Sequence, residues 1–329
     1  MVAKSKTDLK DKAAKRDREQ RQRIGHLERL VAKQQTRIDR SQRIKYRLPR
    51  PAKIKKTKDF YRIVIPDTHG CFVDDKAIAA FLADLKEMSG KVREIVMLGD
   101  HLDCGGFLAE HHTIGYVAEA NYSFEDDIAA TNTLLDAIQE ICPRVPIHYL
   151  EGNHERRIEK WCVTKAHSSK NATRGTVELL MKNFLKMFAT ENVLQLDKRG
   201  INYYKQGQFY NDCRIPSTIR LGKCYFTHGS RTGSSPAKAM LRDFGACVVF
   251  GHVHRSDSCI DRNVKDGEKG AWTPGCLCRL QPLWQHTQLT GWSHGYGLQL
   301  VREDESFLHV NVPIIEGRSY LNQLTGGGK

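Results

Sequence analysis

Long apolar runs are missing from this chain of 329 residues. Its apolar stretches are no longer than a strand, whereas a membrane-spanning helix needs about 20 apolar residues in a row. The lysine-rich first residues also lack the apolar stretch of a secretory signal peptide. These two absences argue against an integral membrane protein and predict a soluble, cytoplasmic protein without membrane contacts.

Paired cysteine spacings are also missing, although the chain contains ten cysteines. No two of them form Cys-x-x-Cys, and the chain is neither small nor secretory in character, so we expect reduced thiols rather than disulfides. Cys276 and Cys278 do form a Cys-x-Cys. This pair can hold a soft metal ion, but without a partner ligand nearby it is more typical of alternate residues on a strand.

Residues 61–329 carry no net charge, because 31 basic residues balance 31 acidic ones. The whole excess of +14 therefore lies in residues 1–60, which hold 21 Lys and Arg against 7 Asp and Glu. Proline is absent from residues 7–45 and apolar residues recur on one helical face, which predicts a long basic helix. A Pro- and Lys-rich stretch then predicts an extended linker. We expect an arm over residues 1–59 and the catalytic domain over residues 60–329.

The charge of the arm favours a polyanionic partner. Lys and Arg side chains neutralise the phosphates of a nucleic acid and release their counterions, so the arm is predicted to bind nucleic acid. The candidate contacts are the basic residues nearest the core: Arg40, Arg43, Lys45, Arg47, Arg50, Lys53, Lys55 and Lys56. Two alternatives stay open, a solvated tail that improves solubility and a helix through which the chain forms homo-oligomers.

The core alternates short apolar runs with helical patterns. The runs 61–66, 92–98 and 145–150 are typical of strands, and an amphipathic stretch follows each of them, the longest over residues 124–141. This alternation predicts an α/β fold with crossover helices. After Asn202 strand-like runs dominate, which predicts a second sheet.

Polar residues follow five of these predicted strands, and a glycine stands beside them each time. In chain order they are Asp67 and His69, Asp100 and Asp103, Asn153 with His154 and Glu155, His228, and His252 with His254. The carboxyl ends of strands in an α/β fold border the ligand crevice, so these side chains should converge. Imidazole, carboxylate and amide groups together favour a divalent transition metal.

This ordered series, D-x-H, G-D-x-x-D, G-N-H-E, a single His and G-H-x-H, resembles the calcineurin-like metallophosphoesterase superfamily over about residues 60 to 280. The resemblance implies a four-layer αββα sandwich of two mixed β-sheets flanked by helices. It also implies two divalent metal ions per chain, with manganese expected first and zinc, iron or nickel as alternatives. One ion would be held by Asp67, His69 and His254, the other by Asn153, His228 and His252, and Asp100 would bridge them.

The same resemblance implies the remaining roles in the site. His154 would be the general acid, or a hydrogen-bond donor in the transition state, and Asp103 would orient it. Asp103 has an alternative role as a cap of the segment that follows it. Glu155 is expected to be an acid in the first turn of a helix.

Two departures from the superfamily's protein phosphatases bear on the substrate. Those enzymes carry an Arg directly after the second Asp of G-D-x-x-D, and this chain has Cys104 at that position. They also have His-Gly-Gly at the single His, where this chain has His-Gly followed by Ser230. Both departures favour the nuclease and phosphodiesterase branch. We predict hydrolysis of phosphodiester bonds in nucleic acid, including DNA, by metal-activated water. The alternative is a phosphomonoesterase acting on phosphoproteins or small phosphate esters. A metal-bound scaffold without turnover is disfavoured because His154 is present.

Overall fold

The structure of this protein is a computed structural model. It describes residues 59–105, 122–168, 174–210, 213–265, 267–282 and 289–321. The predicted basic helix and linker over residues 1–58, with all eight candidate nucleic-acid contacts, lie outside the described residues.

The first sheet has seven strands and is mixed. Four strands in a row are parallel, β1 to β2 to β3 to β4, and β10, β11 and β12 add antiparallel pairs beyond β1. Their bounds are Phe60–Ile65 (β1), Val92–Met97 (β2), Ile147–Leu150 (β3), Asn202–Tyr204 (β4), Gly295–Val301 (β10), Phe307–Ile315 (β11) and Arg318–Ser319 (β12).

The second sheet has five strands in the order β5-β6-β7-β9-β8 and is also mixed. The pairs β6–β7 and β7–β9 are parallel, whereas β5–β6 and β8–β9 are antiparallel hairpins. The bounds are Thr218–Leu221 (β5), Cys224–Thr227 (β6), Val248–Phe250 (β7), Ser256–Asn263 (β8) and Gly267–Pro274 (β9).

The two sheets pack face to face over one apolar core. From the first sheet the core contains Val64 of β1, Val96 of β2 and Leu98 directly after β2. From the second sheet it contains Phe226 and Val249, and all five side chains are fully buried. Strands buried on both faces appear in the sequence as continuous apolar runs, as in β1 and β7. The sheet-on-sheet core places the ends of β1, β2, β3, β6 and β7 beside one another.

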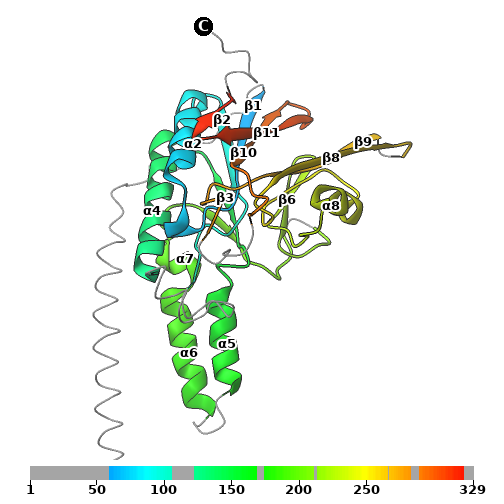
Figure 1. Ribbon diagram of the computed structural model, residues 1–329. Coiled ribbons are helices and arrows are strands. Elements are labelled where there is room, and N and C mark those ends of the chain that lie inside the picture. Colours follow the sequence, from blue (N-terminus) through cyan, green and yellow to red (C-terminus); the bar gives the residue numbers. More distant parts are fainter. Residues whose placement is uncertain are drawn as a thin grey trace, which may run out of the picture. The chain divides into compact units, whose positions relative to one another are not determined.

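Helices cover the outer faces of both sheets, as Figure 1 shows. Helices α2 (Asp75–Met88) and α4 (Phe124–Ile141) lie on the first sheet, and α8 (Pro236–Phe244) packs on β7, β8 and β9. The side chain of Asp74 caps α2 by accepting from the N–H of Lys76 and of Ala77, which supplies two of the bonds a helix start lacks. The predicted αββα sandwich is therefore confirmed.

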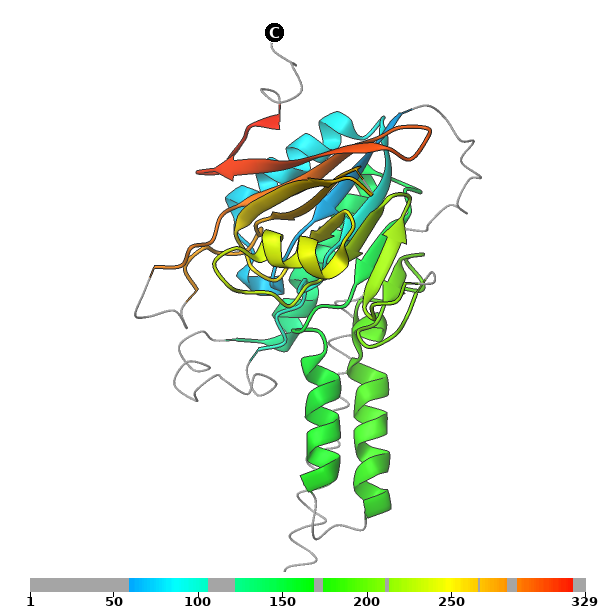
Figure 2. The same ribbon diagram turned by 90° about the vertical axis from the view of Figure 1, so that its right-hand side faces the viewer.

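Two helices form a hairpin that extends away from the sheets (Figure 2). They are α5 (Arg157–Ser168) and α6 (Arg174–Phe188), and Trp161 of α5 packs on Phe184 of α6 with ring centroids 5.1 Å apart. The short helix α7 (Thr190–Val193) follows α6. A 3-10 helix, η1 (Gly70–Phe72), lies near the start of the domain, before α2. The hairpin matters for function because the first residue of α5 reaches into the site described below.

The structure adds one strand and corrects one sequence-based expectation. Strand β8 was not predicted, because its residues are almost all polar and exposed and it is stabilised by pairing along its length with β9. Cys276 and Cys278 were expected as alternate residues of a strand. The structure places both after the end of β9, buried, in single bridges to His294 and Val73.

All ten cysteines are free thiols, as expected. No helix in the described part of the chain combines the length and apolarity needed to cross a membrane.

Candidate metal centre

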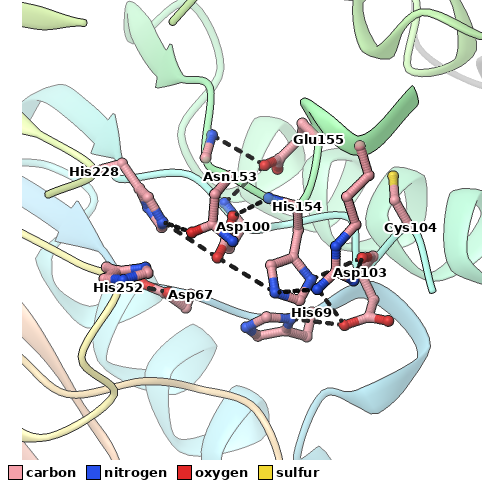
Figure 3. Close-up of polar contacts among 12 residues, drawn as sticks. Asp67, His69, Asp100, Asp103, Cys104, Asn153, His154, Glu155, His228 and His252 are labelled. Carbon is pink, nitrogen blue, oxygen red and sulfur yellow. Dashed lines mark hydrogen bonds and ion pairs between the residues drawn. The ribbon is translucent and has the colours of Figure 1, made fainter. Parts of the chain in front are cut away.

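The loops that follow β1, β2, β3, β6 and β7 converge, and their polar side chains point toward one another (Figure 3). Backbone bonds lock the loops together: the N–H of His69 donates to the carbonyl of Asp100 at 2.9 Å, and that of Gly251 donates to the carbonyl of His228 at 2.9 Å. All seven predicted metal ligands lie in this cluster.

One group of donors comes from the loops after β1 and β7. Nε2 of His69 lies 3.1 Å from Nε2 of His254, which in turn lies 2.9 Å from Oδ2 of Asp67. The Asp67 carboxylate also accepts from the backbone N–H of His252 at 3.0 Å. Nε2 of His254 thus lies within 3.1 Å of a donor atom of each of the other two residues, which places the three side chains around one candidate cation position.

A second group lies beside the first. Nε2 of His228 is 2.9 Å from Oδ1 of Asn153 and 3.2 Å from Oδ2 of Asp100. His252 completes it: its ligand atom lies within 4.8 Å of those of Asp100 and His228, and the rings of His228 and His252 meet edge to face at 5.1 Å. Asp100 also shares a group with His69, so its carboxylate stands between the two sets.

Two of the imidazole rings are held so that Nε2 faces the cluster. Nδ1 of His69 donates to Oδ1 of Asp103 at 2.9 Å, and Nδ1 of His228 donates to the carbonyl of Leu98 at 3.0 Å. An acceptor at Nδ1 fixes the tautomer and leaves the Nε2 lone pair for a metal ion, which is the usual arrangement around histidine ligands.

The charge balance of the cluster also calls for a cation. Asp67, Asp100 and Asp103 are all at most 1% exposed. Burial lowers the pKa of His228, but the carboxylate of Asp100 outweighs it and raises the pKa to about 10. Burial raises the pKa of Asp67, and His254 more than compensates, so the net pKa lies below its ordinary value. Buried carboxylates need positive partners, and metal ions satisfy the same oxygens and nitrogens. The residues present therefore fit a metal centre.

Four of the candidate ligands have strained backbone conformations. The φ angles of His69, Asp100, His252 and His254 are 53°, 53°, 72° and 56°. Residues other than glycine rarely adopt this left-handed region, and each such residue costs about 1–3 kcal/mol, so strain of this kind persists where the surrounding structure enforces it and gathers at functional sites.

One glycine beside the ligands is required by close approach. A Cβ at Gly152 would lie 2.0 Å from Oδ1 of Asp100 and 2.3 Å from its backbone nitrogen. No side chain fits there, which explains the Gly before Asn153 in the sequence.

His154 and Asp103 lie directly against the cluster. Nδ1 of His154 is 2.8 Å from the carbonyl oxygen of Asp103 and 3.2 Å from its Oδ1, and Nε2 lies 3.9 Å from Oδ2 of Asp100. Burial lowers the pKa of His154, and the carboxylates of Asp100 and Asp103 outweigh it, so the net pKa is raised. Asp103 contacts both His69 and His154, which a cap of the following segment would not do.

Glu155 has a different place from the one expected. It precedes α5, and its buried carboxylate accepts from the backbone N–H groups of Asp100, His101, Leu102 and Gly152 and from the Tyr149 hydroxyl. Its role is thus to hold the loop that carries Asp100.

Asp127 of α4 also holds a loop of the site through backbone hydrogen bonds. It accepts from the N–H groups of Asp103 and Cys104 and from the hydroxyl of Tyr122. Burial raises its pKa to about 7. No local pattern in the sequence marks this residue, because it contacts a loop 24 residues earlier in the chain.

Arg157 is a site residue that was not predicted from the sequence. Its Nη1 donates to the carbonyl of Asp103 at 2.9 Å and its Nη2 to Nε2 of His154 at 3.0 Å. The sequence does contain a pattern that could have identified it, because Arg157 follows His154 by three residues at a helix start, and side chains at this spacing on a helix are neighbours.

Comparison with known proteins agrees with this geometry. The family described as calcineurin-like phosphoesterase matches residues 62–256, a span that contains every candidate ligand. The chain belongs to the calcineurin-like phosphoesterase family, whose members depend on metal ions to hydrolyse phosphate esters.

Two solved structures are similar to this chain at low sequence identity. The hypothetical protein PH1004 from Pyrococcus horikoshii OT3 is 12% identical, with a TM-score of 0.38, 78% of this chain and 89% of that one being covered. Vps29 from Chaetomium thermophilum is 11% identical with a TM-score of 0.30, and the match covers 76% of this chain and 96% of Vps29. No curated protein matches the chain.

Proposed function

We propose that this protein is a dinuclear metal-dependent phosphoesterase that hydrolyses phosphodiester bonds in nucleic acid. The observation that supports hydrolysis is the convergence of two donor groups that share Asp100. Two divalent ions held there would supply charge neutralisation for a phosphoryl group and Lewis-acid activation of water. The remaining steps belong to the chain's own side chains.

His154 is proposed to protonate the leaving oxygen. Burial lowers its pKa, but the carboxylates of Asp100 and Asp103 raise it above the ordinary value, which favours the protonated ring that a general acid needs. In that form Nδ1–H stays on the carbonyl of Asp103, and Nε2–H is available to the substrate. The contribution expected of such a group is about 100- to 10,000-fold.

Arg157 is proposed to bind the phosphoryl oxygens. A guanidinium donates only, so its contact with Nε2 of His154 requires that nitrogen to be unprotonated. Once Nε2 carries a proton the two donors repel, and a phosphate oxygen becomes the better partner for Nη2. The substrate would therefore pull Arg157 from His154 and leave Nε2–H directed at the leaving group.

The choice of a diester in nucleic acid rests on charge. Residues 61–329 are neutral overall, so the +14 of the arm is what would attract a polyanion. A phosphomonoesterase is the second candidate, favoured by one observation: Arg157 places a guanidinium beside Asp103, next to the position that Cys104 leaves without a cation. The lack of Arg at position 104 therefore no longer argues against a terminal phosphate.

One panel separates these candidates. The full-length chain is loaded with manganese, zinc, nickel or magnesium and offered p-nitrophenyl phosphate, bis(p-nitrophenyl) phosphate, and end-labelled single- and double-stranded DNA and RNA. Cleavage of nucleic acid and of the aryl diester in preference to the monoester is the expected result. Preference for the monoester would establish the phosphatase instead, and no hydrolysis with any metal would overturn the proposed function.

A further inference from the structure

Cys278 lies at the first group of metal ligands. Its Sγ, Nε2 of His69 and Nε2 of His254 are all within 4.8 Å of one another. The residue is only 2% exposed. Among the described residues, no other cysteine belongs to such a group, although the chain has ten. The thiol therefore meets the partner ligands that the Cys-x-Cys pattern lacked in the sequence.

The backbone holds Cys278 against the segment that carries two of these ligands. The N–H of Leu277 donates to the carbonyl of Asp67 at 2.8 Å, and Cys278 itself bridges to Val73. On the other side, Nε2 of His294 donates to the carbonyl of Cys278 at 2.8 Å. The position of the thiol is thus fixed to the metal loop by the fold, as a ligand requires.

We infer that Cys278 is a ligand of the ion held by Asp67, His69 and His254, and that this position selects a thiophilic metal such as zinc, iron or cobalt. The inference rests on the metal dependence proposed above and deepens it. Metal binding replaces the thiol proton, which passes to solvent, and forms a metal–sulfur bond.

This assignment makes the two positions chemically unequal. Sulfur and imidazole ligands favour zinc, iron and cobalt over manganese and magnesium. The group around Asp100, Asn153, His228 and His252 offers only oxygen and nitrogen and accepts harder ions. The expected occupant is therefore a mixed-metal or zinc-type centre and not a pair of manganese ions.

Cobalt spectroscopy with a matched control tests the ligand. The full-length chain is titrated with Co(II), and the near-ultraviolet sulfur-to-cobalt charge-transfer band is followed for the wild type, Cys278→Ser and Cys276→Ser. Cys276 is the matched control because it is equally buried and two residues away, and its side chain contacts both the thiol of Cys278 and, at 3.8 Å, the carbonyl of Cys278. The band should vanish in Cys278→Ser alone. Zinc affinity at that position should fall by at least about 10- to 100-fold, the effect of losing an outer-shell partner, while manganese affinity changes less.

X-ray absorption of the zinc-loaded wild type gives a test that needs no variant. A sulfur neighbour at about 2.3 Å is expected beside nitrogen and oxygen neighbours. Two bound ions with no sulfur neighbour, or a band lost in Cys276→Ser and kept in Cys278→Ser, would overturn the inference and leave the metal-dependent function standing. Failure of the wild type to bind any ion would overturn both.

Discussion

Arg157 and His154 lie three residues apart and face one another, with Nη2 of the guanidinium 3.0 Å from Nε2 of the imidazole. This contact ties the first turn of α5 to the metal loops. It also supplies a cation at the edge of a cluster whose buried side chains include three carboxylates.

Replacing Arg157 by Met should weaken hydrolysis without removing metal. A charge-assisted hydrogen bond to phosphate is worth about 1.5–3 kcal/mol, so kcat/KM should fall by about 10- to 100-fold. Arg157→Lys should recover only part of the loss, because a lysine cannot offer two parallel donors. The matched control is Arg156→Met at the exposed neighbouring residue. Equal losses in the two Met variants would contradict the role given to Arg157.

Replacing His154 by Ala should separate acid catalysis from metal binding. We expect both ions to stay bound while about 2–5 kcal/mol of transition-state stabilisation is lost. The loss should shrink for aryl esters with good leaving groups, since these need no proton. Kinetics on a series of aryl diesters and metal analysis of the same samples provide the measurement. A loss that does not depend on the leaving group would rule out the acid role.

Replacing Asp100 by Asn should disrupt both metal positions. The carboxylate stands between the two donor groups, and the variant loses its negative charge while keeping its size. Metal content by mass spectrometry should fall toward one ion or none, with hydrolysis abolished. The control is Asp197→Asn at an exposed position outside the site. Two ions and a normal rate in the Asp100 variant would refute the assignment.

His309 should make the protein less stable in acid. Burial lowers the pKa of this histidine from 6.5 to about 4. The unfolded state therefore binds the proton more readily, so the stabilisation is present above the unfolded pKa and is lost as pH falls through it. Between about pH 7 and about pH 4.5 the loss is on the order of 2 kcal/mol.

Urea unfolding across this range measures the effect. The variant His309→Gln, which cannot titrate, should show a smaller decrease in the free energy of unfolding over the same pH range. The ring packs on Trp272 at 5.1 Å and lies outside the metal cluster, so metal content serves as the internal control. If the parent and the variant lose stability equally, His309 is not the group responsible.

Removing residues 1–59 tests the proposed docking arm. Hydrolysis of a small aryl diester should change little, because that substrate meets only the core. Nucleic-acid binding should weaken and depend less on salt: each phosphate contact adds about 0.7–0.9 to the slope of log affinity against log salt, so losing six contacts changes it by roughly four to five. An unchanged affinity and slope would leave the arm as a solubility or partner-binding segment.

The sequence by itself determined the fold class and the identity of the converging residues. Apolar runs that end in Asp67, Asp100, Asn153, His228 and His252 place polar side chains at the ends of neighbouring strands, because strand direction and period are local properties. The long helix over residues 124–141 was likewise predicted with its observed bounds, since its amphipathic periodicity is local.

Only the tertiary structure decided which distant groups support the site. Cys278 reaches His69 across 209 positions of the chain, and Asp127 holds the loop of Asp103 from another element. Glu155 and Arg157 stand one and three residues after His154, yet their partners lie on the loop after β2, some 50 residues away. Such contacts depend on how the two sheets and α4 pack, which local patterns do not encode. The sheet-on-sheet core is the physical reason they form.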